Sequence, residues 1–540
     1  MISFNLIYML FVFCVFSMGT DFLIQISGVF PNQITQLFNA TLVHHYGIYV
    51  DETVLSLGLS MSPIAESVGW IVGNALFISF MDSKGRRWVC VHLRFYLVSS
   101  AALLTLTGIL TGSYELFLLG KFVTGLHFPI IFIVTQVYIA ECTPDKYRGF
   151  VSGIFSNGDV VSLLVLYLTG RSTFLGSERW FMFPLLSLLI SVMLLLLTLR
   201  LPDSPKYLVS RIDRKQMERV VRFYHGNEAD VDEIISSFTK EKNLTSEEVL
   251  SLKEIWNNET TREALLILLS IKMLHVVAPN VAEKNNTVLV QTSLGFTVDE
   301  SLSLNSLLTF VFIPILFVGS YLIEKYGRRF VIFSYFSITY FKILLMFTAQ
   351  IIINSQGASS ITKIMGIINE SSTRIASSVG IGAISPLLVT ELFPPSARAK
   401  MSQLGMYIAC FSSTIFIAIY PILNQIWAPA FYIPFLFIQP PIIYFLYKKF
   451  PETKQRPVYK IIQDFDKSVR SRGGSTISYG LGFKKMKSIV RKRSKTFNKL
   501  EESRSLIDTK ERNRAHTEIA HNHYGTYYPN PNSSNNEKLI

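Results

Sequence analysis

The segment IKMLHVVAPN, Ile271 to Asn280, carries two ionisable side chains inside an apolar run. Lys272 and His275 are three positions apart, so they share one face if the run is helical. Together they can bind an anionic group, and the histidine charge responds to pH near neutrality. Two structural alternatives stay open: Lys272 pairs with Asp159 or Glu66, or it extends to the aqueous interface.

Other ionisable residues interrupt apolar segments in the same way. If these segments span a membrane, each unpaired charge is costly, and each is therefore a candidate functional residue. Asp21 and Lys121 can form an ion pair that opens when the acid takes up a proton, because a nearby cation lowers a carboxyl pKa. Two roles stay open for Asp21 and Lys121: they couple transport to protons, or they form a static ion pair. The residues of this kind are Asp21, Glu66, Lys121, Asp159, Lys272, His275 and Arg374.

Three short motifs occur twice, in the same order, in the two halves of the chain. DSKGRR at 82–87 recurs as EKYGRR at 324–329, and AECTPDKYRG at 140–149 recurs as TELFPPSARA at 390–399. PDSPK at 202–206 recurs as PETKQ at 451–455. Three ordered coincidences indicate an internal duplication, and parallel repeats are typical of transporters that rock about a central site.

The duplicated motifs combine carboxylates, arginines and glycines. Carboxylates and guanidinium groups form bidentate ion pairs, and glycine permits tight turns that other residues avoid. We expect these pairs to hold the two halves together when the cytosolic side is shut, although plain topology would also explain the arginines. The predicted cytosolic gate contains Asp82, Gly85, Arg86, Arg87, Glu141, Arg148, Glu324, Gly327, Arg328, Arg329, Glu391 and Arg398.

The composition indicates a membrane protein. Of the 540 residues, 49% are hydrophobic and only 16% are charged. The net charge of +13 gathers in short loops and in the tail, which favours the positive-inside rule over nucleic-acid binding. The four cysteines are scattered and predict neither disulfides nor a metal site. We find no catalytic motif and expect neither an enzyme nor a cofactor.

We predict an all-α membrane protein with twelve transmembrane helices, because each span needs about 20 apolar residues. The first could instead be read as a signal peptide, but it lacks a basic start. The absence of Lys and Arg from alternate loops places both termini in the cytosol. The predicted spans are 4–28, 54–80, 91–112, 116–140, 150–170, 181–200, 263–284, 301–323, 331–353, 360–390, 402–424 and 429–448.

These spans define four predicted regions. Residues 1–200 and 262–450 form two six-helix halves, and 201–261 form a cytosolic linker with short amphipathic helices. Residues 451–540 form a basic tail for which we expect mostly disorder. Its basic cluster is either solvated or lies on anionic lipid headgroups. Asn39 heads an Asn-Ala-Thr glycosylation sequon in the first external loop.

Over residues 4–456 these motifs resemble the sugar porters of the major facilitator superfamily, and within them the facilitative glucose transporters. The resemblance rests on FNATLVHHYG, KFVTG, the two GRR motifs, YIAECTPDKYRG, LPDSPKYL, VTELFPPSAR and FPETK. It implies the major facilitator fold and alternating access of a small solute without ATP. It also implies that Asp21 stands where proton-coupled members have aspartate, and Lys121 where the family has arginine.

The chain departs from this family where sugars bind. The family's seventh helix reads Gln-x-x-Gln-Gln-x-Ser-Gly-x-Asn, whose amides hydrogen-bond sugar hydroxyls. Counted from Arg262, these positions hold Lys272, His275, Val276, Ala278, Pro279 and Val281, and Asn280 misses the asparagine position by one. The tryptophan position of the tenth helix holds Pro386. The remaining candidate positions hold Ser156, Asn157, Ser385, Ala409 and Cys410.

Losing these hydrogen-bonding groups should lower the affinity for hexoses. The leading hypothesis is nevertheless a transporter of a hexose or related polyol in the plasma membrane. The alternatives are a proton-coupled or organic-anion transporter with an altered site, and a non-transporting membrane sensor. The expected partners are a small-molecule substrate, the lipid bilayer and, in the coupled case, protons.

Overall fold

A computed structural model of the chain describes its helical part. The described residues are 3–16, 21–144, 147, 151, 155, 159–176, 178–209, 211–212, 214–245, 252–257, 259–276, 279–317, 325–378, 388–389, 392–393 and 395–451. They lie in one compact unit, Met1–Val469, and include no strand. The predicted tail after position 451 lies outside them.

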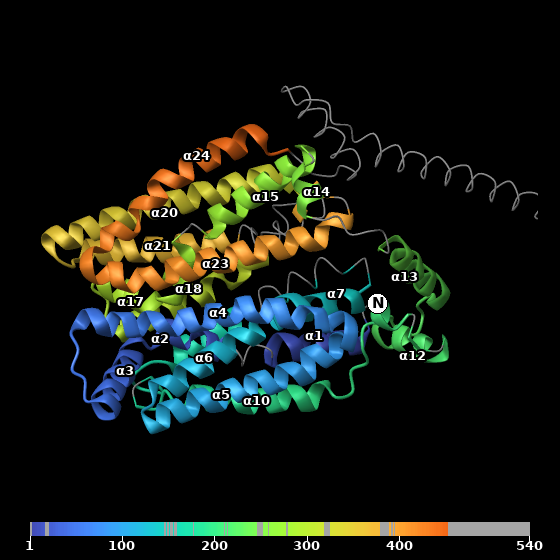
Figure 1. Ribbon diagram of the computed structural model, residues 1–540, viewed down its shortest axis with the longest axis horizontal. Coiled ribbons are helices and arrows are strands. Elements are labelled where there is room, and N and C mark those ends of the chain that lie inside the picture. The colour runs from blue at the N-terminus through green and yellow to red at the C-terminus, as the bar shows by residue number, and fades with distance from the viewer. Residues whose placement is uncertain are drawn as a thin grey trace, which may run out of the picture. The chain divides into compact units, whose positions relative to one another are not determined.

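The first half of the chain contains helices at all six predicted spans (Figure 1). The first external loop also forms a helix, which the sequence analysis did not predict. Proline at its first position and a left-handed Gly47 after its end bound that helix. The helices are α1 (Phe4–Phe16), α2 (Asp21–Val29), α3 (Pro31–Tyr46), α4 (Glu52–Lys84), η2 (Trp88–Leu93), α5 (Arg94–Thr111), α6 (Tyr114–Pro129), η3 (Ile130–Thr135), α7 (Gln136–Cys142), α9 (Asp159–Thr169) and α10 (Met182–Thr198).

The linker forms short helices, as its periodicity predicts. They are α11 (Pro205–Leu208), α12 (Arg214–His225), α13 (Val231–Thr245) and α14 (Leu252–Asn257). In α12 the buried residues Met217, Val221 and Tyr224 lie three and four positions apart, so they share one face. Met217 and Val221 belong to the same apolar cluster as Phe238 of α13.

The second half contains helices at the other six predicted spans. The seventh span is divided into α15, α16 and α17 and continues to Ser293, into the predicted external loop. Pro279 precedes α16 and lacks the amide hydrogen needed to continue a helix. The helices are α15 (Glu259–Val276), α16 (Asn280–Asn285), α17 (Thr287–Ser293), α18 (Val298–Phe312), η5 (Ile313–Phe317), α20 (Arg328–Gln356), α21 (Ser360–Ser378), α23 (Pro395–Trp427), η6 (Ala428–Phe431) and α24 (Ile433–Lys449).

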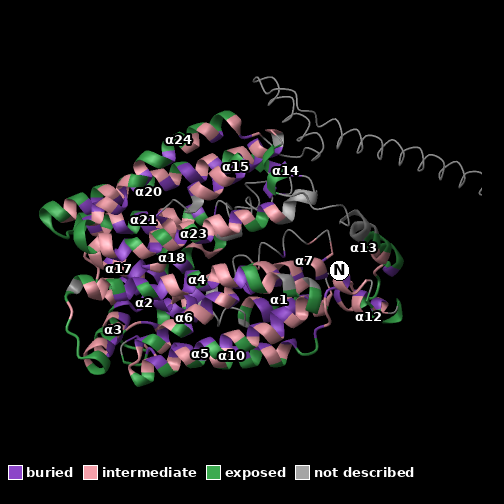
Figure 2. Cartoon of the chain, in the orientation of Figure 1, coloured by how far each residue is buried: buried purple, intermediate pink, exposed green. Residues whose placement is uncertain are grey.

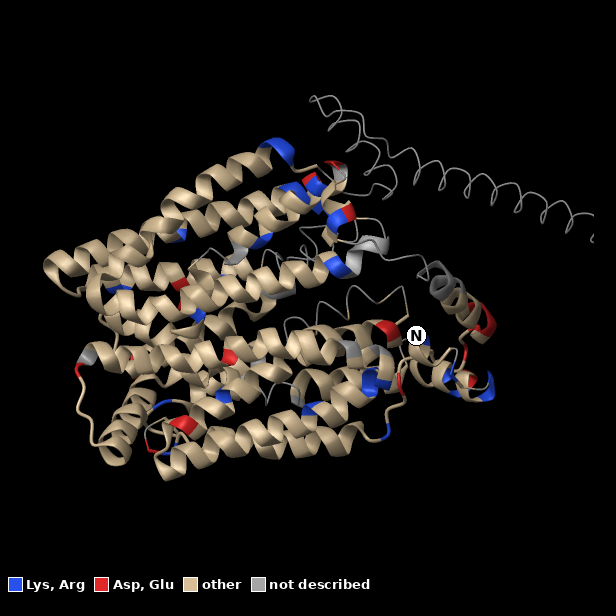
Figure 3. Cartoon of the chain, in the orientation of Figure 1, with Lys and Arg blue, Asp and Glu red and all other residues tan. Residues whose placement is uncertain are grey.

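Length and composition fit a membrane environment. Six helices in the described part of the chain are long and apolar enough to cross a bilayer, and α1 and α10 are shorter apolar helices. Figure 2 shows exposed and half-buried residues along the outer faces of α20 and α24. Figure 3 shows few charged residues along the helices and more of them near their ends, where water and headgroups lie.

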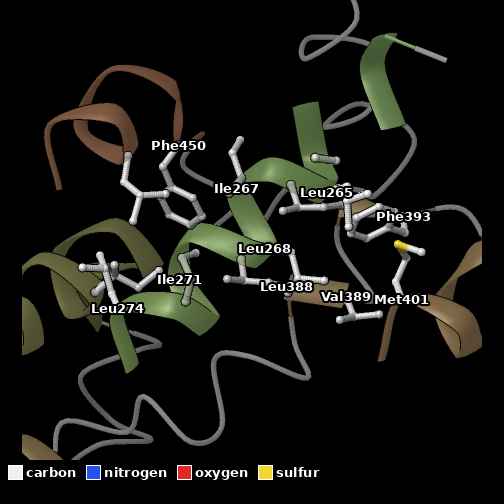
Figure 4. Packing of buried hydrophobic residues seen from close by; sticks show 14 of the residues in the cluster. Leu265, Ile267, Leu268, Ile271, Leu274, Leu388, Val389, Phe393, Met401 and Phe450 are labelled. Carbon is white, nitrogen blue, oxygen red and sulfur yellow. The ribbon is translucent and has the colours of Figure 1, made fainter. Parts of the chain in front are cut away.

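Apolar clusters stabilise the helices, and three of them show which residues of the two halves pack together. One contains only residues of the linker end and second half, including Leu268, Ile271 and Phe450 (Figure 4). A second, with Phe13 and Tyr138, contains only residues of the first half and the linker. The third surrounds the predicted external loops and combines residues of both halves. Its members include Phe30, Trp180, Val288 and Leu302.

Candidate functional site

Arg86 and Glu141 of the predicted gate form a bidentate ion pair. Arg86 Nε lies 3.0 Å from Glu141 Oε2, and Arg86 Nη2 donates to Glu141 Oε1 at 3.2 Å. The Ser204 hydroxyl, from the repeated PDSPK motif, donates to the same carboxylate. All three residues belong to the first half or its boundary with the linker. In this structure the pair ties the cytosolic ends of helices within one half, so the expectation that such pairs join the two halves when the cytosolic side is shut stays a prediction.

Asp203 of the PDSPK motif caps the helix that follows Gly85. Its Oδ1 accepts hydrogen bonds from the backbone amides of Arg86 and Arg87, at 3.1 and 3.2 Å. Burial raises the pKa of this carboxyl, while the amide hydrogen bonds oppose the shift. Gly85 has φ of +100°, and a Cβ there would lie 2.2 Å from Asp203 Oδ2. This position therefore needs glycine for both conformation and space.

The second arginine of each GRR motif makes the same contact in its own half. Arg87 Nη2 donates to the carbonyl of Leu199 at 2.6 Å, and Arg329 Nη2 donates to the carbonyl of Tyr447 at 2.6 Å. Both carbonyls lie at the end of the last membrane helix of their half, α10 and α24. Gly327 has φ of +92°, like Gly85. The internal duplication thus extends from sequence to side-chain contacts.

The other predicted gate residues are only partly described. Arg328 is half-buried at the start of α20. Asp82 and Arg398 lie in helices, but their side chains are outside the described part of the structure. Arg148, Glu324 and Glu391 lie wholly outside it. A further ion pair at this end joins Lys449 to Glu263 at 2.8 Å.

Lys121 of α6 is fully buried and forms an ion pair with Glu66 of α4. Its Nζ also donates to the carbonyl of Leu23 in α2 at 2.7 Å. The alternative in which Glu66 pairs with Lys272 is therefore wrong, because Glu66 already has a buried cation. Asp21 lies at the start of α2, but its side chain is outside the described part, so its pairing with Lys121 stays a prediction.

The structure contains a second buried ion pair that was not predicted from the sequence. Lys342 of α20 lies 3.4 Å from Glu283 of α16 and donates to Asn280 Oδ1 at 2.6 Å. The Tyr432 hydroxyl donates to Glu283 at 3.2 Å, and Asn280 donates to the Tyr335 hydroxyl at 3.2 Å. Both charged residues interrupt predicted spans, so the rule that flagged Lys272 would have found them. The Asn280 side chain therefore forms hydrogen bonds with two residues of α20, Lys342 and Tyr335.

Arg374 belongs to a polar network in the second half. Its Nη2 donates to Asn305 Oδ1 at 3.3 Å, and Asn305 Nδ2 donates to Gln291 Oε1 at 2.9 Å. Glu370, one turn earlier in α21, lies 4.0 Å from the guanidinium. The network joins α17, α18 and α21, so Arg374 has polar partners inside the bundle. Sequence alone flagged Arg374 but gave no partner.

Lys272 differs from these buried cations. It lies in α15, with Cε 3.5 Å from the position where Gly405 of α23 would carry a Cβ. The side chain is half-buried, and no described residue forms an ion pair or hydrogen bond with it. The side chains of His275 and Asp159, and the residues Ser156, Asn157 and Ser385, are outside the described part. The candidate cavity positions that the structure describes are Lys272, Pro279, Asn280, Val281, Ala409 and Cys410.

Contacts at the predicted external side join the two halves. Ser172, after α9, donates its hydroxyl to Asp299 Oδ2 at 2.5 Å and its amide to Oδ1 at 3.0 Å. Arg171 Nη2 donates to the Ser306 hydroxyl at 3.3 Å. With the shared apolar cluster around Trp180, these contacts close the external ends of the bundle.

Comparison with known proteins decides the family. A family model described as Sugar (and other) transporter matches residues 9–465. The chain belongs to this family. Among curated relatives, Facilitated glucose transporter protein 1 of Caenorhabditis elegans is 24% identical over 426 residues, covering 76% of this chain and 81% of the relative. The facilitated glucose transporter member 5 of Ovis aries is 22% identical, covering 80% and 85%.

Solved structures confirm the fold of this sugar transporter family member. The inward open xylose transporter XylE from E. coli matches with a TM-score of 0.61 at 14% identity, covering 83% of this chain and 99% of XylE. XylE bound to 6-bromo-6-deoxy-D-glucose matches with a TM-score of 0.61 at 16% identity, covering 84% and 99%. The protein is a multi-pass membrane transporter with the major facilitator fold, as predicted.

Proposed function

We propose that this transporter moves a hexose or related polyol across the plasma membrane by alternating access. The observation that supports this most is the repeated contact of Arg87 with Leu199 and Arg329 with Tyr447. It ties the third membrane helix of each half to the sixth, so each half can move as a unit. We propose half boundaries of 1–200 and 262–450, with 201–261 as linker and 451–540 as tail.

The contacts between the halves indicate which state of the transport cycle the structure represents. The described structure has its external ends joined through Ser172 and Asp299, whereas the apolar clusters nearer the cytosolic ends each stay within one half or its adjacent linker. We therefore assign it to the part of the cycle in which solute exchanges with the cytosol. Rocking would break the external contacts and bring the cytosolic motifs of the two halves together. Both termini are cytosolic in this proposal, and Asn39, exposed on α3, is the glycosylation site.

The central site would recognise hydroxyls differently from a standard glucose carrier. Lys272 replaces an amide with an ammonium that only donates hydrogen bonds. Its contact with Gly405 places it between α15 and α23, near the half-depth of the membrane, because nine residues from Glu263 rise about 14 Å. We propose that Lys272, with His275 and Ser385, binds solute oxygens there.

The same lysine supports a second candidate, transport of an acidic sugar. A half-buried cation with no described anionic partner would favour a carboxylate over a neutral hydroxyl. Proton coupling through Asp21 has less support, because Lys121 already has the Glu66 carboxylate as a partner. Neutral hexoses remain the first candidate because of the family.

Uptake into proteoliposomes tests these proposals. We would compare hexoses, polyols and sugar acids at two external pH values, for the wild type and Lys272→Gln. Lys363→Gln, an exposed lysine paired with Glu300, is the matched control. We expect saturable uptake, with KM raised roughly tenfold in Lys272→Gln and unchanged in the control, as for loss of one hydrogen bond to a charged group.

Other outcomes would contradict parts of this proposal. Uptake of no member of the panel would contradict the transport of sugars. Strong glucose uptake that Lys272→Gln leaves intact would contradict the altered site. A preference for sugar acids that Lys272→Gln abolishes would make an acidic sugar the proposed substrate in place of a neutral hexose. Proton movement that accompanies uptake and is lost in Asp21→Asn would support proton coupling through Asp21.

A further inference from the structure

The backbones of the two halves meet at Gly28, near the predicted external end of α2. A Cβ added there would lie 3.0 Å from the carbonyl oxygen of Asn285 and 3.1 Å from that of Lys284, at the end of α16. Gly28 lies inside a helix, so the glycine provides space and not an unusual turn. Figure 1 shows α2 beside α17, which follows α16 in the chain. The closed external side therefore includes a contact between two backbones.

A buried ion pair fixes α2 to the rest of the first half, about one turn before Gly28. Lys121 of α6 donates to the carbonyls of Leu23 and Ile24 at 2.7 and 3.3 Å. The same ammonium forms an ion pair with Glu66 of α4. Movement of α2 away from α4 and α6 would take oxygen partners from a buried charge, which is costly. We therefore expect α2 to move with its half.

A second buried ion pair fixes α16 to the second half, directly beside the contact. Glu283 lies 3.4 Å from Lys342 of α20 and accepts a hydrogen bond from the Tyr432 hydroxyl at 3.2 Å. Lys342 donates in turn to Asn280, in the first turn of α16, at 2.6 Å. A bend at Pro279 that moved α16 alone would break these contacts. We therefore expect α16 to move with its half as well.

We propose that α2 and α16 form the external gate of this transporter, and that each is fixed to its own half by a buried lysine. The gate opens and closes only as the halves rock, and Gly28 is the residue whose small size lets it close. The two helices belong to the first and seventh spans, so the duplication gives them equivalent places in the two halves. The role of Gly28 rests on the alternating access proposed above.

External labelling of a cysteine buried beneath the gate tests this. Val288→Cys is the reporter, because Val288 has no exposed surface and belongs to the apolar cluster that both halves share. In intact cells we would measure how fast a membrane-impermeant maleimide labels the full-length reporter protein, after subtracting the labelling of the protein without the reporter. The same rate is measured with Gly28→Leu and Gly28→Ala added. Thr107→Leu, which adds bulk on the exposed face of α5, is the matched control.

We expect Gly28→Leu to raise the labelling rate about tenfold, because the added side chain overpacks the closed state and not the open one. Gly28→Ala should raise the rate less, since the carbonyls opposite need to shift by only a few tenths of an ångström. Thr107→Leu should leave the rate unchanged. The double variant Glu283→Gln with Lys342→Met removes the second anchor without leaving a buried charge, and it should raise the rate about threefold with Gly28 in place.

Three results would overturn the proposal. Unchanged labelling in Gly28→Leu, or an equal rise in Thr107→Leu, would show that the Gly28 contact does not close the external side. An unchanged rate in the double variant would show that Lys342 does not hold α16. Thermal unfolding verifies that each variant is folded, and Gly28→Ala tests the contact if Gly28→Leu does not fold. Labelling needs no solute, so a lack of sugar uptake would contradict the proposed substrate and not the gate.

Discussion

Two lysines have no exposed surface in a protein that crosses a membrane. Lys121 and Lys342 are each fully buried, and each has a glutamate partner, Glu66 or Glu283. A charge at this depth is tolerated only with a partner, since removing one member leaves the other uncompensated. Additional oxygens from Leu23 and Asn280 complete the coordination of the two ammonium groups. These pairs hold membrane helices at fixed rotations.

We predict that Glu66→Gln lowers the free energy of unfolding by about 3–5 kcal/mol, because Lys121 is left charged and buried. Equilibrium unfolding in mixed micelles measures the loss. The double variant Glu66→Gln with Lys121→Met should recover most of it. Glu300→Gln, which removes an exposed pair with Lys363, should change little. If the stability losses of the single variants Glu66→Gln and Lys121→Met simply add in the double variant, the two side chains do not stabilise each other.

At the scale of the elements, two glycines begin membrane helices in a conformation that other residues avoid. Gly327, with φ of +92°, directly precedes α20, and Gly85, with φ of +100°, precedes the helical segment that begins at Arg86 and continues as η2. The turn at Gly85 lets the Asp203 carboxylate reach the first amides of the next helix. The GRR motif is therefore a helix start as well as a source of charge.

We predict that Gly85→Ala destabilises the protein by about 1–3 kcal/mol from backbone strain, and by more if the added Cβ displaces Asp203. Gly226→Ala is the matched control, because Gly226 has φ of +92° and no atom within 4 Å of an added Cβ. The same unfolding assay measures both. If the two variants lose equal stability, Asp203 is not displaced and only strain acts.

At the scale of the whole molecule, the predicted external and cytosolic sides differ. Residues of both halves share one apolar cluster and the contact of Ser172 with Asp299 at the external ends. Alternating access requires these contacts to separate once in each cycle. A covalent link there should therefore stop transport.

We predict that the double variant Ser172→Cys with Asp299→Cys forms a disulfide under oxidation and loses uptake, because the side-chain oxygens it replaces are 2.5 Å apart. Uptake before and after reduction in proteoliposomes measures the effect. Each single cysteine variant is a control and should keep its uptake under oxidation. Uptake that persists in the cross-linked protein would contradict movement at this contact.

The sequence by itself determined the membrane spans, the duplication and the family. Apolar runs of about 20 residues fix spans locally, and GRR and Glu-x6-Arg motifs recur in order. A broken seventh helix and the helix at Pro31 were missed, because Pro279 and the amphipathic pattern of α3 were read only as part of a span and a loop.

Only the tertiary structure decided which charged groups meet. Glu66 pairs with Lys121 and not with Lys272, Asp203 caps a helix more than a hundred residues away, and Arg86 binds within its own half. The partners in these contacts lie far apart in the chain on separate segments. Their meeting depends on how each helix is rotated and how deep it sits against its neighbours, and packing sets both.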